Sequence, residues 1–207
     1  MTTEARLERP IARSGTRSAF RTTKVRVRKM GADAYQVHLE GTMRPGWAGS
    51  IASGLAKSGI TIDRVYAVRA SDGAWRAELD VRRSPEGQSP EHVAYAALVG
   101  RDADGDASTP FVIERFELAP SRAHGGALAL TVHAKDALGF LGALLGRLAF
   151  LSLFPAELRI ETHGERVFDR LWLTGVAGGT PSSEARAMLA QMLERALPSS
   201  DDSRRER

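Results

Sequence analysis

Two glycine-containing turns are the places in this sequence where residue types and spacing favour binding of a small molecule. They read Met43-Arg44-Pro45-Gly46-Trp47 and Lys135-Asp136-Ala137-Leu138-Gly139-Phe140. A turn that leads into a helix directs backbone N–H groups toward the positive helix end, so a ligand carboxylate could bind there. The glycines would let it approach closely, and Asp136 could accept an amino group. The candidate ligand-binding residues are therefore Arg44, Gly46, Asp136, Leu138 and Gly139.

A simpler interpretation of the same turns needs no ligand. The two glycines would only satisfy the turn conformation, and Asp136 would cap the following helix. Both interpretations stay open on the sequence.

The sequence shows few other residue patterns that are typical of catalysis or metal binding. The five histidines show no helical ligand spacing, and no Ser-His-acid arrangement is suggested. The acidic loop Asp102-Ala103-Asp104-Gly105-Asp106 resembles a calcium loop, but its glycine is displaced and Ile113 stands where the closing glutamate belongs. We predict no catalytic residues, no metal and no cofactor, and therefore a protein that is not an enzyme.

Composition favours a globular protein of one ordinary domain or two small ones. The chain has 207 residues, of which 43% are hydrophobic and 26% charged, and it contains no cysteine. No secretory signal is evident, and the apolar segment 140–154 is too short to span a bilayer and is interrupted by Arg147. We expect a soluble, cytoplasmic protein.

The positive charge is concentrated near the amino terminus. Residues 1–33 hold nine Lys or Arg against three acidic residues, whereas the whole chain carries a net charge of +4. Such a segment can bind nucleic acid, but Phe20 is the one aromatic residue among its arginines, so we expect a basic disordered leader over residues 1–23. Val25 and Val27 could add a short edge strand.

The first half of the chain reads as strand, helix, strand, strand, helix, strand. Strands are predicted around residues 35–39, 60–68, 75–81 and 111–118 from alternating apolar positions. One helix runs from Trp47 to Gly59, and a second begins at Ser89-Pro90-Glu91 and ends at Gly100.

The second half repeats the pattern at an almost constant offset. Gly46 and Gly139 are 93 positions apart, and Pro90 and Pro181 at the two later helix starts are 91 apart. We interpret this as an internal duplication. The second copy lacks a fourth strand, because only Ser, Asp, Arg and Glu follow Pro198.

The two copies resemble ACT domains, which are small ligand-sensing modules. The resemblance lies in the two turns, where that family has Asp-x-Pro-Gly-Leu, and in the hairpins at 71–81 and 164–174. Within the family, the pair is similar to the carboxy-terminal ACT pair of the bifunctional uridylyltransferase/uridylyl-removing enzymes. The departures are Met43 in place of the first acid and Leu138 in place of the second proline. The resemblance implies an α+β fold of two ferredoxin-like βαββαβ repeats with antiparallel sheets, the second without its last strand.

These expectations define a function to be tested. The domains are predicted as 24–120 and 121–197, followed by a disordered tail over 198–207. The protein would be a free-standing regulatory sensor in nitrogen or amino-acid metabolism that binds an amino acid at the turns or between the copies. We expect a homodimer or a partner enzyme, and no nucleic-acid or membrane partner. The alternative is a protein–protein interaction module with no small-molecule ligand.

Overall fold

The computed structural model describes residues 23–100 and 112–198. The predictions about the basic leader up to residue 22, the acidic loop at 102–106 and the tail beyond residue 198 concern positions outside these ranges.

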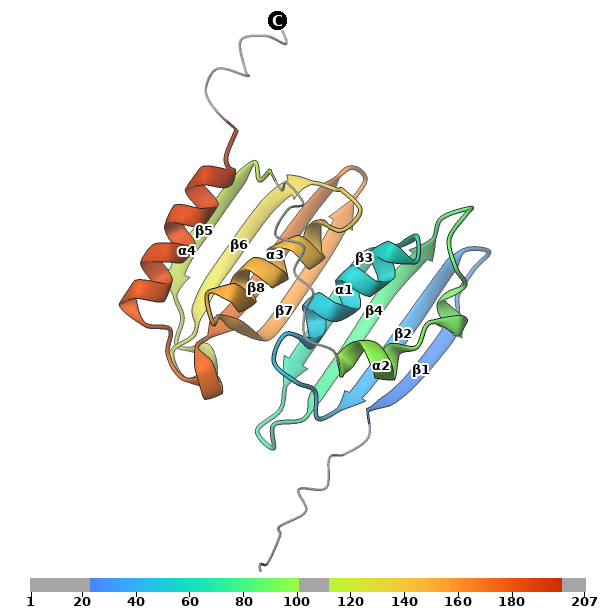
Figure 1. Ribbon diagram of the computed structural model, residues 1–207, viewed down its shortest axis with the longest axis horizontal. Helices are drawn as coiled ribbons and strands as arrows, with labels where there is room; N and C mark the ends of the chain where they lie inside the picture. The colour runs from blue at the N-terminus through green and yellow to red at the C-terminus, as the bar shows by residue number, and fades with distance from the viewer. Residues whose placement is uncertain (1–22, 101–111, 199–207) are drawn as a thin grey trace, which may run out of the picture.

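The described residues form one antiparallel sheet of eight strands with four α-helices, so the predicted α+β class is confirmed. The strands follow one another across the sheet in the order β1-β2-β4-β3-β7-β8-β6-β5. The helices lie on one face of it (Figure 1). The strand bounds are Lys24–Lys29 (β1), Ala34–Gly41 (β2), Ile60–Arg69 (β3), Trp75–Arg83 (β4), Arg115–Pro120 (β5), Leu128–Lys135 (β6), Phe154–His163 (β7) and Arg166–Thr174 (β8).

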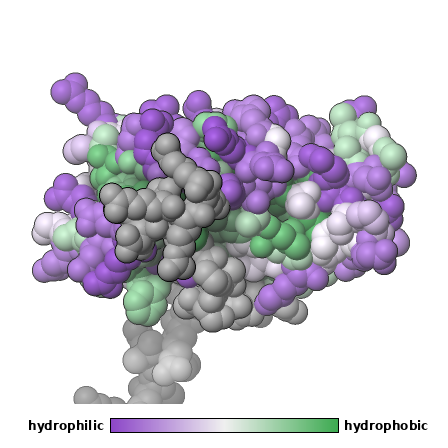
Figure 2. All heavy atoms as spheres, turned by 90° about the horizontal axis from the view of Figure 1, so that it is seen from above, coloured by the Kyte–Doolittle hydropathy of each residue, from purple (hydrophilic) through white to green (hydrophobic). Residues whose placement is uncertain are grey.

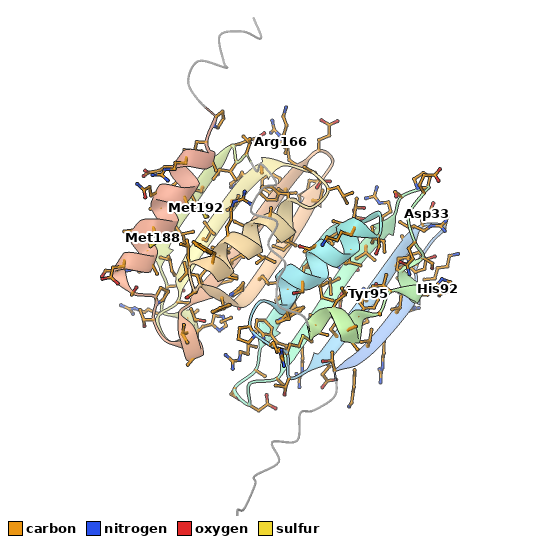
Figure 3. All side chains as sticks on the ribbon, viewed as in Figure 1. Asp33, His92, Tyr95, Arg166, Met188 and Met192 are labelled. Atoms are coloured by element: carbon orange, nitrogen blue, oxygen red, sulfur yellow. The ribbon has the colours of Figure 1, made fainter. Side chains whose placement is uncertain are left out.

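The helices cover the apolar face of the sheet. They are α1 (Trp47–Lys57), α2 (Tyr95–Val99), α3 (Phe140–Phe150) and α4 (Ser183–Ala196), with short 3-10 turns at Pro90–His92, Ala123–Gly125 and Val176–Gly178. On α4, Met188 is exposed whereas Met192 packs against the core (Figure 3). No helix in the described ranges is long and apolar enough to cross a membrane.

Alternation of apolar residues explains why the central strands form. Tyr35, Val37 and Leu39 of β2 are buried, and their neighbours in the chain face the opposite side of the sheet. The same alternation runs through Val167, Asp169 and Leu171 of β8, where one of the buried positions is an acid. The buried residues of these strands and of α1 and α3 belong to a single hydrophobic core.

The two halves of the chain meet through β3 and β7, which pair antiparallel at the middle of the sheet. Tyr66 is opposite Arg159 in this pairing, and the offset of 93 residues relates these two positions. The same offset relates Val65 to Leu158 and Ala67 to Ile160. It therefore exchanges the pair Val65–Ile160 with the pair Ala67–Leu158. An approximate twofold axis therefore passes between Tyr66 and Arg159, and the sheet continues from one half into the other.

The prediction that the second repeat lacks a strand is wrong. β5, which the sequence analysis assigned to the end of the first copy, pairs with β6 at the outer edge of the second half. The place beside β2 is taken by β1, because a tight turn closed by the hydrogen bond from Met30 N to Ala34 O joins the two strands. Each half is thus strand, strand, helix, strand, strand, helix, and the boundary predicted at residue 120 falls after the strand that begins the second half.

The helix predicted from Pro90 to Gly100 is shorter than expected. A 3-10 turn ends at His92, Val93 is extended, and α2 has only five residues. Tyr95 and Val99 are the buried members of α2 (Figure 3). Leu98 occupies the space that a side chain at Gly54 of α1 would fill, since a Cβ there would lie 2.6 Å from Leu98 Cδ2.

Helices α1 and α3 contact each other across the boundary between the halves. A Cβ at Gly142 of α3 would lie 2.6 Å from Ser53 Oγ and 3.1 Å from Ser53 N of α1. Glycine at position 142 therefore permits the close approach of α1 and α3.

Candidate ligand-binding clefts

The two predicted turns have the same conformation. Gly46 and Gly139 each precede a helix in the left-handed region, with φ of 83° and 90°. Equivalent hydrogen bonds close them, from Trp47 N to Arg44 O at 3.2 Å and from Phe140 N to Ala137 O at 2.9 Å. A positive φ is accessible to glycine at little cost, so the glycines are required by the turn itself.

Among the described residues, no side chain caps the amino-terminal end of α1 or α3. Neither helix has a side-chain cap hydrogen bond, and neither has an acid in its first turn. Helix α4 differs, since Ser182 Oγ accepts a hydrogen bond from Ala185 N and Glu184 lies in the first turn. Asp136 therefore does not cap α3, and its carboxylate instead has a backbone hydrogen bond with Ala137 in the turn before the helix.

Asp136 lies on the rim of a small cavity between the two halves, which we call the acidic cleft. Its volume is about 40 Å³. Leu138 and Gly139 belong to the same rim, and Leu138 is 57% exposed. The walls come from α1, β3, α3, β7 and β8, and they include Ala52, Ala56, Ile60, Ile62, Ile160, Val167 and Asp169.

The surroundings of Asp136 are acidic on balance. Partial burial and the neighbouring Asp63 raise the pKa of Asp136, whereas Arg82 and the backbone N–H of Ala137 act in the opposite direction. Arg82 is itself paired with Asp63, with Nη2 and Oδ1 2.7 Å apart. One cation is thus shared by two carboxylates at this rim.

Asp169 is the functional candidate that the sequence analysis missed. Its side chain lines the acidic cleft from β8 and is 1% exposed. Neither carboxyl oxygen has a hydrogen-bond partner within the part of the chain that the structure describes. Burial, followed by the charge of Asp136, raises the pKa of Asp169 to about 8. The sequence signal that could have identified Asp169 is an acid in the apolar row of an alternating strand, between Val167 and Leu171.

A second cleft occupies the equivalent place on the other side of the approximate twofold axis, and we call it the aromatic cleft. Its volume is about 120 Å³. It is lined by Gly46 and Trp47 of the first turn and by residues of α3 and β7. Trp47 and Trp75 meet edge to face there, with ring centroids 5.2 Å apart. Arg69 and Thr174 are polar members of the lining, whereas Arg44, predicted as a ligand residue, is exposed and lines neither cleft.

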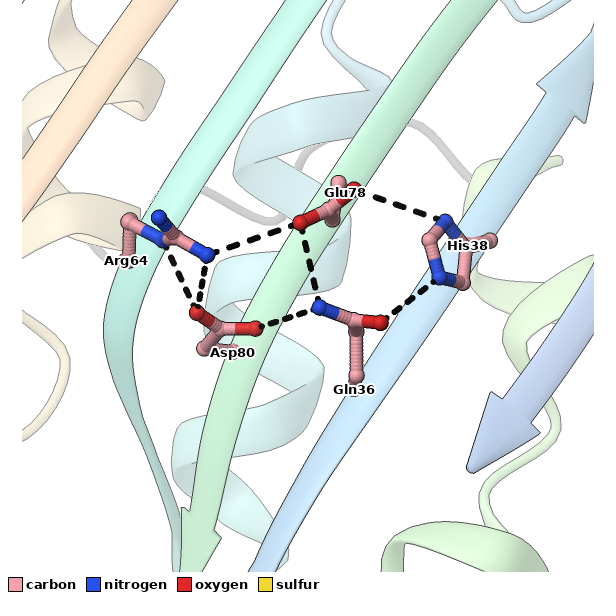
Figure 4. A network of polar contacts seen from close by, with 5 residues as sticks. All are labelled: Gln36, His38, Arg64, Glu78 and Asp80. Atoms are coloured by element: carbon pink, nitrogen blue, oxygen red, sulfur yellow. Dashed lines mark hydrogen bonds and ion pairs between the residues drawn. The ribbon is translucent and has the colours of Figure 1, made fainter. Parts of the chain in front are cut away.

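The outer face of the sheet carries polar networks rather than a cleft. In the first half, Gln36 Nε2 donates hydrogen bonds to Glu78 Oε1 at 3.1 Å and to Asp80 Oδ1 at 3.2 Å. Arg64 Nη2 lies 2.7 Å from Asp80 Oδ2, and His38 completes the network (Figure 4). These side chains satisfy one another, so their polarity is accounted for without a ligand.

The outer face of the second half is built around Trp172. The guanidinium groups of Arg159 and Arg170 lie 5.2 Å and 5.0 Å from the centre of its rings. Glu157 is almost fully buried between His124 and Arg159, at 2.9 Å and 2.7 Å. This cluster is internally paired, and Phe168 beside it is 38% exposed.

Three of the histidines contact neighbouring polar side chains. His124 and His163 lie within 3.1 Å of Glu157 and Glu161, and His133 Nε2 lies 3.0 Å from Arg115 Nη2. Among the described residues, no group of three or more histidine and acidic side chains is arranged to hold a metal ion.

The fold and the clefts define an α+β protein in which two similar halves share one sheet and enclose a pair of related but chemically different cavities. No protein-family model, curated protein sequence or solved structure matches this chain.

Proposed function

We propose that this protein is a non-enzymatic sensor that binds a small metabolite, an amino acid, in the acidic cleft between its halves. The observation that carries the proposal is the juxtaposition of an uncapped helix end with two carboxylates on one cavity. The amino terminus of α3 offers positive charge to a ligand carboxylate, and Asp136 and Asp169 offer acceptors to an amino group. Gly139 allows the approach, and the exposed Leu138 flanks the entrance.

The ACT-like interpretation of the fold belongs to this proposal. Each half has two helices on one face of four antiparallel strands, as the resemblance implies, except that the edge strand comes first in the chain rather than last. A role in nitrogen or amino-acid metabolism, a cytoplasmic location and a homodimer or partner enzyme remain predictions that accompany it.

The proposal predicts that at least one amino acid raises the thermal unfolding midpoint. A ligand present at a hundred to a thousand times its dissociation constant adds about 2.7–4.1 kcal/mol to the free energy of unfolding. A screen of the twenty amino acids by thermal shift measures this directly. Asp136→Ala is expected to abolish the shift. Glu117→Ala, which removes an exposed acid from β5, is the matched control and is expected to preserve it. A shift that survives in Asp136→Ala would place the ligand elsewhere.

The second candidate is a protein–protein interaction module that uses the outer face of the sheet. It is favoured by Tyr66 and Phe168, which are 47% and 38% exposed on the face that carries no helix. The surface seen from above is mainly hydrophilic, with hydrophobic patches between the polar side chains (Figure 2). If no amino acid shifts the unfolding midpoint, this candidate takes precedence.

A further inference from the structure

Asp169 is one of three residues with a buried, unpartnered polar side-chain atom among the described residues, beside Tyr95 and Arg83, and it is the one carboxyl among them. Its partners across the sheet are Val132 of β6 and Ile160 of β7, both buried and apolar. Both carboxyl oxygens lack a hydrogen-bond partner among the described residues. A buried polar group without a partner costs about 1–3 kcal/mol, and more when it is charged. Such a group calls for an explanation, and a bound ligand is one of the few available.

The fold itself does not require an acid at this position. In the first half, Ala77 pairs with Leu39 and Ala67, and in the second half Asp169 pairs with Val132 and Ile160. Each partner of Ala77 is related by the 93-residue offset to a partner of Asp169, so Ala77 is the counterpart of Asp169. By the same offset, the counterpart of Asp136 is Met43, which is 7% exposed. Both acids are therefore present in one cleft and replaced by apolar residues in the other.

The two acids determine the charge of the ligand group. Within residues 23–100 and 112–198, Asp136 and Asp169 are the only titratable residues that line the acidic cleft, and α1, β3, α3 and β7 contribute none to its walls. Arg82, whose charge acts on Asp136, already pairs with Asp63. The described lining of the cleft therefore contains no cationic side chain, and a ligand can supply that charge.

The dimensions and the walls of the cleft restrict further which kinds of cation can bind there. A volume of about 40 Å³ accommodates a group of a few heavy atoms, since one water needs about 10–15 Å³ by the same measure. Ile60, Ile62 and Val167 give the walls an aliphatic character that suits a methylene next to the charge. A metal ion fits less well, because two carboxylates provide too few ligands for a hard cation.

We propose that the acidic cleft binds the ammonium group of a primary amine between Asp169 and Asp136, and that binding releases the proton of Asp169 to solvent. The inference rests on the proposed function in that it assigns the amino group of the ligand to Asp169 as well as to Asp136. It extends that function by predicting that simple alkylamines, which lack a carboxylate, also bind.

Proton release follows from the state of Asp169 in the free protein. With a pKa of about 8, the carboxyl is mainly protonated at pH 7, and an ammonium ion in contact with it favours the ionised form. The charges that act on it are Asp136 in the turn and, through Asp136, Asp63 and Arg82. Affinity is thus expected to increase up to about tenfold per pH unit below pH 8. It is expected to stay constant until the amine itself loses its proton near pH 10.

The test uses methylamine, ethylamine and propylamine hydrochlorides as probes of the full chain. Thermal unfolding is measured with each salt up to about 100 mM, because a ligand of two to four heavy atoms binds weakly. Sodium chloride and tetramethylammonium chloride at equal concentration are the control salts, the second being a cation without N–H donors. We expect the primary amines alone to raise the midpoint, and more so at pH 8.5 than at pH 6.5. Titration calorimetry in two buffers of different ionisation enthalpy should show release of close to one proton per amine at pH 7.

Variants that introduce the residues found at the equivalent positions of the first half test whether the amine binds in the acidic cleft. Asp169→Ala and Asp136→Met reproduce the residues of the aromatic cleft, and Asp169→Asn preserves the shape without the charge. Each is expected to remain folded and to lose the amine effect, whereas Glu117→Ala retains it. An equal amine effect in Asp169→Ala, a larger effect of Mg²⁺ or Ca²⁺ than of any amine, or no amine effect at all would overturn the inference.

The outcomes also separate this inference from the function on which it rests. If an amino acid stabilises the wild type and Asp169→Ala equally but not Asp136→Ala, the sensor proposal stands and the role of Asp169 is refuted. If amines bind but no amino acid does, the cation site stands and the ligand is not an amino acid.

Discussion

Replacing Asp169 with asparagine is expected to remove a large pH dependence of stability between pH 4 and pH 8. The folded-state pKa of Asp169 is about 8, above the ordinary value of about 3.9. Between these values the folded state binds more protons than the unfolded state, so the free energy of unfolding decreases as pH increases. The stabilising contribution is complete below about pH 4 and is lost as pH rises to 8. At about 1.4 kcal/mol per pH unit, the loss is roughly 5 kcal/mol over this range.

Denaturant unfolding of the wild type and of Asp169→Asn between pH 4.5 and pH 8.5 measures the effect. The asparagine variant also buries an unsatisfied amide, so the informative quantity is the difference between the two proteins as a function of pH. We expect this difference to shift by several kcal/mol in favour of the variant as pH increases. Asp33→Asn, at an exposed acid that pairs with Arg83, is the control and should show little of this trend. Parallel pH profiles for the wild type and Asp169→Asn would contradict the assignment of a neutral, buried carboxyl.

Replacing Trp47 with alanine is expected to destabilise the protein by about 3–5 kcal/mol. Trp47 is 3% exposed, begins α1 directly after the Gly46 turn, and contacts Trp75 edge to face. The substitution removes a large buried side chain together with an aromatic contact worth about 0.5–1.5 kcal/mol, and it enlarges the aromatic cleft.

The shift of the denaturant midpoint at constant slope gives this cost. Phe168→Ala is the comparison, because that ring is 38% exposed on the outer face, and we expect a cost of about 1 kcal/mol or less. Similar costs for the two substitutions would show that the core between α1 and the sheet is not packed as described.

The sequence predicted the elements better than their partners. Alternation located β2, β4, β6 and β8, because a strand with one buried face leaves a period-two pattern whatever lies beside it. The same pattern predicted a strand around residues 111–118, where the structure has β5 at Arg115–Pro120, but alternation does not say which strand a segment pairs with. The assignment of β5 to the first copy was wrong for this reason, because its pairing with β6 depends on the tertiary structure.

The sequence likewise identified some residues of the candidate site and missed others. The Gly46 and Gly139 turns and Asp136 could be identified from local residue types, and the structure places both glycines in left-handed turns directly before a helix. Asp169 lies 33 positions beyond Asp136 and shares its cavity only because β8 pairs with β6 and β7. That Ala77 is its counterpart also follows from register, which a single sequence does not reveal. Arg44 was predicted from its place in the motif, but its side chain is exposed outside both clefts.

The most direct measurement is a pH titration of the Asp169 carboxyl carbon by NMR, with and without a primary amine. We expect a pKa near 8 in the free protein and a clear decrease of that pKa when the amine is bound. A titration near pH 4 in the free protein, or a midpoint that no amine or amino acid changes, would contradict it.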